Sequence, residues 1–120
     1  MAKHISGIEE FQRKLQNFKR EKAKKFEVAV TRAGLWLLRE SMKIVPVDTS
    51  ALKNSAPNAT RREGTGFDSV MIVGYGTDYA IYVHENTGAN FKPGKQAKFL
   101  EEPARKGRKH MADIIKKALQ

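Results

Sequence analysis

Apolar residues recur at helical spacing at the start of the chain, and a proline ends the pattern. They lie three or four residues apart from Ile8 to Phe18, and the same period continues from Phe26 to Ile44. Such spacing places apolar side chains on one face of an amphipathic helix. Pro46 lacks an amide hydrogen and disfavours helical angles in the residue before it, so the helix is expected to end by about Ile44. The sequence therefore predicts either one long helix or two helices joined near Glu21.

Two segments are apolar enough to form the centre of a core. Gly34–Leu38 is apolar on every side of the predicted helix, and Val70–Val73 is a run of mostly β-branched residues, typical of a buried strand. Each segment needs another element to cover it. We therefore expect the helix that contains Trp36 and Leu37 to cover a central antiparallel strand at Val70–Val73.

A second strand is expected just before this one. Asn54–Arg62 is the candidate for its antiparallel mate, because the glycine-bearing segment Glu63–Gly66 can reverse the chain between the two. Pro57 cannot donate a backbone hydrogen bond to a neighbouring strand. It therefore indicates an edge strand or a strand that starts late.

The second half of the chain is less regular. Asp78–Gly88 fits a strand or a helix, because its apolar residues match both periods, and the Gly- and Pro-bearing segment Gly88–Gln96 is expected to be a surface loop. A terminal helix follows, and Gly107 weakens its middle by about 1 kcal/mol relative to Ala. The apolar side of this helix is expected to contain Ala104, Met111, Ile114, Ile115, Ala118 and Leu119.

Composition favours one globular domain spanning residues 1–120. The chain has 120 residues, of which 40% are hydrophobic and 30% charged, so it can bury one core and falls among ordinary folded domains. It contains no cysteine, which excludes a disulfide framework and a thiolate nucleophile and favours the cytosol. Its charged first residues and short apolar runs predict neither a secretory signal nor a membrane-spanning helix.

One short motif raises the question of catalysis. Ser50 and Lys53 have the Ser-x-x-Lys spacing of some acyl-transfer enzymes, but that chemistry also needs elements such as Ser-Asp-Asn and Lys-Thr-Gly, which do not occur. We interpret the segment as the start of a helix, with Asp48 as its N-cap and with Val47 and Leu52 as a hydrophobic staple. The chain is therefore predicted not to be an enzyme.

Metal and cofactor sites are not expected either. His4, His84 and His110 are isolated in the sequence and lack partners at metal-ligand spacing. The glycine pairs at Gly64–Gly66 and Gly74–Gly76 lack the third glycine of a dinucleotide site, and the chain has no Walker-type Gly-Lys-Ser/Thr run. We predict no catalytic, metal-binding or cofactor-binding residues.

Four motifs occur in a fixed order: "VPVDTSALKNS", a strand ending in "VGYG", "DYAIYVHENTG" and "KFLEEPA". In order and spacing they resemble the small neck and tail-completion proteins of long-tailed bacteriophages, the gene-product-ten-like family related to lambdoid minor tail proteins. The resemblance covers roughly Ala29 to Leu119. That family usually has Gly where this chain has Ser50, and commonly Glu-Phe-Gly where it has His84-Glu85-Asn86. The residues that carry the resemblance are Pro46, Asp48, Thr49, Leu52, Gly74, Tyr79, Ala80, Tyr82, Val83, His84, Glu85, Phe99 and Leu100.

The resemblance implies an α+β fold, in which long N-terminal helices and a C-terminal helix pack on a small antiparallel sheet. It also implies a structural virion protein without catalysis, a neck, head–tail connector, tail-completion or minor tail component that assembles as an oligomeric ring. Its partners would be further copies, adjacent phage neck or tail proteins and, non-specifically, packaged DNA, but no membrane. It would occur in the virion, and in the host cytoplasm during assembly. Expected interface residues are Tyr79, Tyr82, His84, Asn90, Phe91, Lys92 and Lys95.

The charge supports an alternative function. The net charge is +10, which favours contact with an anionic partner such as nucleic acid. Lysines and arginines gather in Lys19–Lys25, at Arg61 and Arg62, and again between Arg105 and Lys117. Because acidic residues are interspersed, solvated helix faces are the commoner explanation. A basic nucleic-acid-binding module of phage or prophage origin therefore stays open as the alternative.

Overall fold

The computed structural model describes residues 2–46, 50–77, 79–89 and 91–120, with side chains from Gly7 onward. The fold is α+β, as predicted, and consists mainly of helices with one small antiparallel sheet. In chain order the elements are α1 (Ala2–Ile44), α2 (Ala51–Ala59), β1 (Arg61–Glu63), the 3₁₀ turn η1 (Gly66–Asp68), β2 (Val70–Ile72), α3 (Ala80–Glu85), α4 (Glu101–Lys106) and α5 (Arg108–Leu119).

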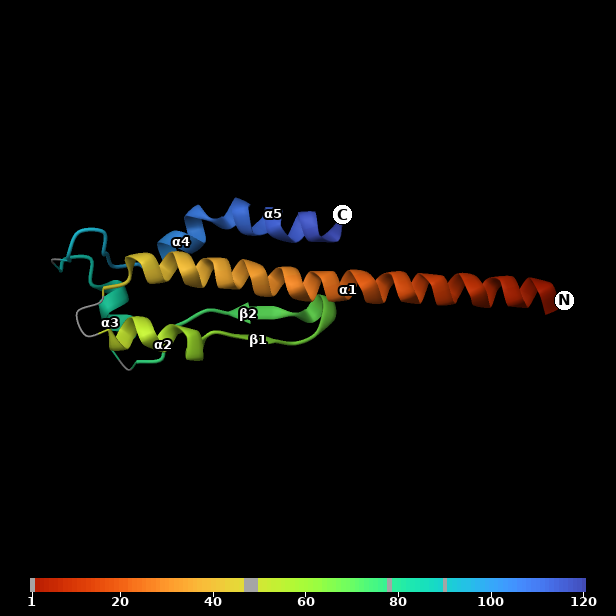
Figure 1. Cartoon of the computed structure of the whole chain (residues 1–120), viewed down its shortest axis with the longest axis horizontal. Coiled ribbons are helices and arrows are strands. Elements are labelled where there is room, and N and C mark those ends of the chain that lie inside the picture. Colours follow the sequence, from red (N-terminus) through yellow and green to blue (C-terminus); the bar gives the residue numbers. More distant parts are fainter. Residues whose placement is uncertain (1, 47–49, 78, 90) are drawn as a thin grey trace.

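Helix α1 forms the axis of an elongated molecule that measures 77 × 25 × 17 Å. Helices α4 and α5 lie along one side of α1, whereas α2, α3 and the sheet lie along the other (Figure 1). The end of α5 and the tip of the hairpin lie at a similar level near the middle of α1, and the N-terminal part of α1 projects alone (Figure 1). We call Gly7–Glu21 the arm, because every residue in this range is exposed.

The helical prediction for the first segment is confirmed, and the alternative of two helices is wrong. A single helix of 43 residues ends at Ile44, two residues before Pro46. Proline disfavours helical angles in the preceding residue and donates no backbone hydrogen bond, which explains the position of this end.

The sheet is smaller than predicted. Strand β1 pairs with β2 in an antiparallel register that places Arg61 opposite Ile72 and Glu63 opposite Val70. Within the described residues the sheet has two strands, so β2 is not a central strand, and Val70 is 55% exposed. The reversal between the strands was correctly placed, and Gly64 there adopts a φ of 76°, which favours glycine.

Most of the predicted partner strand is instead a helix. Residues 54–59 belong to α2, in which Leu52 and Ala56, four residues apart, are buried on the same face. This burial outweighs Pro57, which lies in the last turn of α2 and therefore removes only one hydrogen bond near the end of the helix. The prediction of a strand across Pro57 is therefore wrong, whereas the alternative of a strand that starts late is confirmed, because β1 begins at Arg61.

The helix predicted to cover β2 does so, but through a different residue. A Cβ added to Gly34 would overlap the Met71 side chain, so the glycine lets Met71 of β2 approach the helix backbone closely. Trp36 contacts the other layer instead, with its ring 4.7 Å from the ring of His110 in α5. Residues two apart on a helix point in roughly opposite directions, which explains why Gly34 and Trp36 meet different layers.

The predicted terminal helix is interrupted at Gly107. This residue separates α4 from α5, and a Cβ there would overlap the ring of Trp36. Gly107 therefore does more than weaken a continuous helix, since it allows the indole to pack against the backbone between two shorter ones. The apolar side was correctly predicted, because its six residues are all half-buried: Ala104, Met111, Ile114, Ile115, Ala118 and Leu119.

Candidate assembly interface

Three segments that are distant in sequence meet at the C-terminal end of α1. Val45, Leu52 and Phe99 form a buried cluster there, with exposed fractions of 0%, 3% and 1%. Phe99 lies just before α4 and inserts between the end of α1 and helix α3. Partly buried residues around this cluster are Ile44, Tyr75, Ala80, Val83 and Leu100. Segments that carry the phage-protein resemblance therefore share one core.

Helix α3 resolves the choice left open for Asp78–Gly88, and it presents two different faces. Ala80 and Val83 pack against the buried cluster, whereas Ile81 and Tyr82 are 67% and 75% exposed. Tyr79 is 41% exposed at the start of the helix. Neighbouring residues Tyr82 and Val83 therefore point to different sides of the helix. Tyr82 lies on the outer surface, where a neighbouring protein can contact it.

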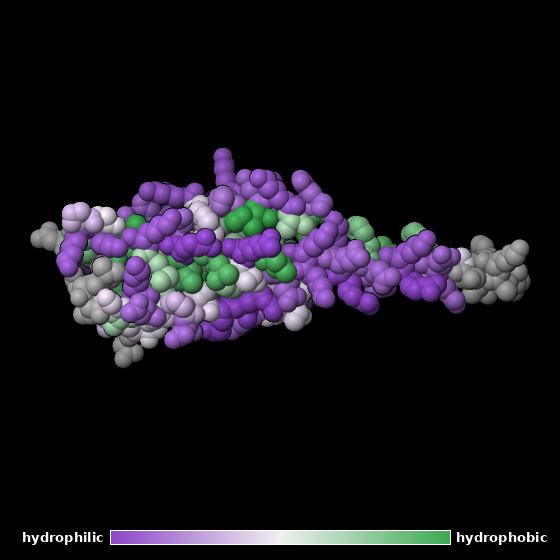
Figure 2. Space-filling model, viewed as in Figure 1, coloured by the Kyte–Doolittle hydropathy of each residue, from purple (hydrophilic) through white to green (hydrophobic). Residues whose placement is uncertain are grey.

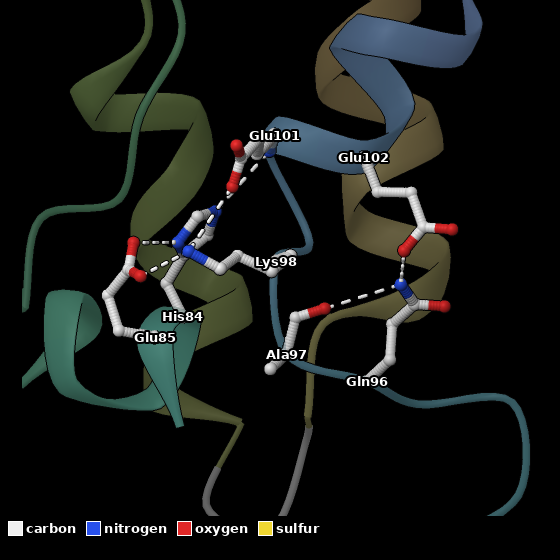
Figure 3. A network of polar contacts seen from close by, with 7 residues as sticks. All are labelled: His84, Glu85, Gln96, Ala97, Lys98, Glu101 and Glu102. Carbon is white, nitrogen blue, oxygen red and sulfur yellow. Dashed lines mark hydrogen bonds and ion pairs between the residues drawn. The ribbon is translucent and has the colours of Figure 1, made fainter. Parts of the chain in front are cut away.

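His84 connects α3 with the start of α4 and is largely covered. Its ring packs edge-on against Phe99, with centroids 5.0 Å apart. Its Nε2 accepts a hydrogen bond of 3.3 Å from the Glu101 amide (Figure 3). The His84 carbonyl oxygen accepts a second hydrogen bond, of 2.7 Å, from the Lys98 amide. Only 16% of the His84 side chain is exposed. His84 therefore positions neighbouring segments and presents little surface to a binding partner.

A small ionic network covers His84. Glu85 accepts a hydrogen bond from the Lys98 ammonium group and lies 3.0 Å from His84 Nδ1 (Figure 3). The hydrogen bond from Lys98, followed by that from His84, lowers the pKa of Glu85. The same bond to Glu85, with a second to Glu101, raises the pKa of Lys98. The network therefore holds these charged side chains against one another at the surface of the cluster.

A second polar contact lies deeper and was missed from sequence. The hydroxyl groups of Ser41 and Tyr75 are 2.7 Å apart, and Ser41 is fully buried. Burial raises the pKa of Tyr75, and the hydrogen bond with Ser41 opposes that effect. The Tyr75 ring also packs edge-on against Phe99 at 5.0 Å. A serine on the apolar side of a predicted helix was the available signal, because a buried hydroxyl needs a partner.

An open cleft of about 660 Å³ lies beside α3. The Thr77 hydroxyl that borders it is buried and has no hydrogen-bond partner within the described part of the chain. The other lining residues are mainly apolar, with ionisable groups at Tyr75, His84, Glu85 and Glu101: Leu37, Val73, Tyr75, Ala80, Ile81, His84, Glu85, Phe99, Leu100, Glu101 and Ala104. The cleft and the outer face of α3 thus form one surface with apolar and polar parts.

The loop Gly88–Gln96 packs its far end against α1. The Gln96 amide donates a hydrogen bond of 3.0 Å to the Ile44 carbonyl, and Lys95 Nζ donates one of 2.9 Å to the Lys43 carbonyl. These bonds satisfy carbonyl groups at the end of a helix, which have no partner within it. Phe91 is half-buried and Lys92 is exposed, while Asn90 lies outside the described residues.

Ser50, directly before α2, has an unusual backbone angle. Ser50 is the N-cap residue of α2, its φ is 61°, and its side chain makes no capping hydrogen bond. The prediction that Asp48 occupies the N-cap position is therefore wrong, because the helix begins at Ala51. Val47, Asp48 and Thr49 lie outside the described residues, and so does the predicted staple contact of Val47.

The described residues include no group of three or more His, Asp or Glu side chains that could hold a metal ion. None of the helices described combines the length and hydropathy that crossing a membrane requires. No protein-family model, curated protein or solved structure matches the chain.

Proposed function

We propose that this chain is a structural protein of the head–tail junction of a long-tailed phage, a neck or tail-completion component that assembles as a ring without catalysing a reaction. Its partners are further copies of itself and adjacent neck or tail proteins. The observation that carries the proposal is the convergence of the motif residues. Leu52, Val83 and Phe99, from three of the motifs, pack in one cluster at the end of α1.

The backbone at position 50 gives independent support. The resemblance implies Gly at this position, and Ser50 has a φ of 61°, where residues with a Cβ are disfavoured. A family pattern that usually has Gly at this position is therefore compatible with the conformation that this chain adopts. In this proposal Ser50 replaces the usual Gly, and its Cβ makes the left-handed backbone conformation at this position strained.

The outer face of α3 provides a surface suited to assembly. Ile81 and Tyr82 are exposed although they are large and apolar or aromatic, and the open cleft adjoins them. Tyrosines contribute large contact areas with little loss of conformational entropy, which makes them frequent interface residues. A ring needs heterologous patches of this kind, because one surface of each copy must meet a different surface of the next.

Deletion of the gene in its phage tests the function. The proposal expects lysates with separate full heads and tails by electron microscopy, and rejoined virions when the protein is supplied. A complementing protein with Ile81→Asp and Tyr82→Asp should fail to rejoin them, whereas the matched surface variant Ala51→Asp should succeed. Normal virions that lack only infectivity or retained DNA would contradict the junction role.

The net charge of +10 favours one second candidate, a nucleic-acid-binding module. Phosphate binding releases counterions and therefore weakens steeply as salt concentration rises. A DNA mobility shift that disappears with added salt, together with normal phage assembly after gene deletion, would favour this candidate over the junction protein.

A further inference from the structure

The arm carries an apolar stripe that no other described element covers, and only the Lys22 ammonium group of the same helix lies over one of its rings, 5.4 Å from the centre of Phe18. Ile8, Phe11, Leu15 and Phe18 are exposed by 49%, 67%, 41% and 56%, and they recur three or four residues apart. Apolar side chains emerge among hydrophilic ones along the projecting helix (Figure 2). Four large apolar residues in one row on an otherwise charged helix mark a surface that another element covers.

The stripe continues the side of α1 on which α5 lies. Lys22 and Trp36 both contact α5, since Lys22 Nζ donates a hydrogen bond to the Leu119 carbonyl and Trp36 packs on His110. Ile8 and Leu15 precede Lys22 by fourteen and seven residues. Positions seven apart on an α-helix drift by only about 20° around its axis. The face of α1 that α5 covers between Lys22 and Trp36 therefore continues along the arm, where no other described element covers it.

The end of α5 determines how much of α1 stays uncovered and open to a partner. Leu119 is the last helical residue of α5 and lies at Lys22, the first residue beyond the arm. A helix that covers the stripe would take the place of α5 along the next part of α1, antiparallel to it as α5 is. The stripe is also centred in the arm, between Phe11 and Leu15. A second arm laid antiparallel about that centre would bring residue 4 of each copy level with Lys22 of the other copy, where α5 ends, so the two stripes would overlap along their whole length.

Charge favours the antiparallel arrangement of two arms. The first half of the arm is net acidic, with Glu9 and Glu10 against one cation, Arg13, whereas the second half is net basic, with Lys14, Lys19 and Arg20 against one acid, Glu21. Antiparallel arms place the acidic half of each copy beside the basic half of the other, and parallel arms place like charges together. Glu10 already lies 3.6 Å from Lys14 in its own helix, so the same pair can also bridge two copies.

We propose that the arms of two copies of this chain pair antiparallel, with Ile8 facing Phe18 of the other copy and Phe11 facing Leu15. The contact is self-complementary about a two-fold axis, so each copy uses the same four residues. It is a contact additional to those of a ring, and it does not depend on the proposed phage function.

Oligomeric state gives the first test. Sedimentation of the full chain should show a concentration-dependent dimer, and the double variant Phe11→Asp, Leu15→Asp should be monomeric while its urea unfolding midpoint matches that of the native chain in dilute solution. The matched control Asn17→Asp, on the opposite side of the arm, should dimerise like the native chain. A native chain that stays monomeric throughout, or a double variant that still dimerises, would overturn the proposal.

Cross-linking fixes the orientation, and the absence of cysteine makes it clean. In the proposed register position 8 meets position 18 of the other copy, whereas the two copies of position 8 lie about 15 Å apart, at about 1.5 Å per residue. A disulfide needs Cα atoms within about 7 Å. A mixture of Ile8→Cys and Phe18→Cys chains should therefore cross-link under mild oxidation, and each variant alone should not. Cross-linking of each variant with itself would indicate parallel arms and overturn the proposal.

Discussion

The two ends of α1 use apolar residues in opposite ways. At the C-terminal end, Val45 and Phe99 are almost completely buried, because segments from distant parts of the chain pack together there. In the arm, Phe11 and Phe18 are more than half exposed on a helix that no other described element covers. One end therefore holds the fold together, and the other end supplies a surface that only association can bury.

The largest difference between the two ends should follow from removing one phenylalanine at each. Phe99→Ala should lower the free energy of unfolding by about 3–5 kcal/mol, because a fully buried ring is lost and a cavity is left. Phe11→Ala should change it by less than about 0.5 kcal/mol at concentrations where the chain is monomeric. Urea denaturation of both variants measures this contrast, and equal effects would remove the distinction.

Glycine substitutions should separate the ends again, with opposite signs. Gly107→Ala should destabilise the chain by about 1–3 kcal/mol, because the new Cβ overlaps the Trp36 ring. Gly7→Ala should stabilise the arm helix by up to about 1 kcal/mol, because nothing lies within 4 Å of the added Cβ. Thermal unfolding would follow the first variant and helical content the second. A neutral Gly107→Ala would contradict the close packing of Trp36.

The turn that leads into the folded end can be improved. Ser50→Gly should raise the free energy of unfolding by about 1 kcal/mol, because it relieves a left-handed conformation that costs roughly 1–2 kcal/mol for a residue with a Cβ. Ser50→Ala keeps the Cβ and should give no such gain. Chemical denaturation of this matched pair decides whether the backbone angle or the lost hydroxyl is responsible.

Acid should weaken the folded end through Glu85, and this effect should be the smallest. Its pKa lies below the ordinary value of 4.5, because Lys98 and then His84 donate hydrogen bonds to the carboxylate. The stabilisation is fully present above that ordinary value and is lost as pH falls through the lowered pKa of the folded state. Unfolding free energies measured from pH 6 to pH 3 should therefore fall less steeply for Glu85→Gln than for the native chain. Parallel curves would contradict this account.

The sequence predicted local features well where one residue type decides them. Pro46 ended the first helix, and glycines reversed the chain between β1 and β2, because backbone chemistry at those positions leaves few alternatives. Asn54–Ala59 was predicted wrongly, since the burial of Ala56 overrides the local signal of Pro57. The layer that each side chain joins depends on packing between distant segments, which spacing does not reveal.

The candidate surface was predicted in part for the same reason. The sequence pointed to Tyr82 and His84 together, but one turns outward and the other is largely covered. The bond between Ser41 and Tyr75 joins positions 34 residues apart, and the cleft beside α3 combines residues from several elements. Such arrangements require the folded chain. The stripe of the arm was visible as a helical face, but its exposure was not.

Hydrogen exchange of the full chain at two concentrations tests the contrast between the ends most directly. A helix without tertiary contacts is marginally stable, so the amides of Gly7–Glu21 should exchange rapidly in dilute solution and slowly when the chain is concentrated enough to pair. The amides of Val45, Gln96 and Lys98, which lie around the buried cluster and donate hydrogen bonds to backbone carbonyls, should be protected equally under both conditions. An arm that is as protected as this cluster in dilute solution, or one that exchanges rapidly at every concentration, would contradict the account.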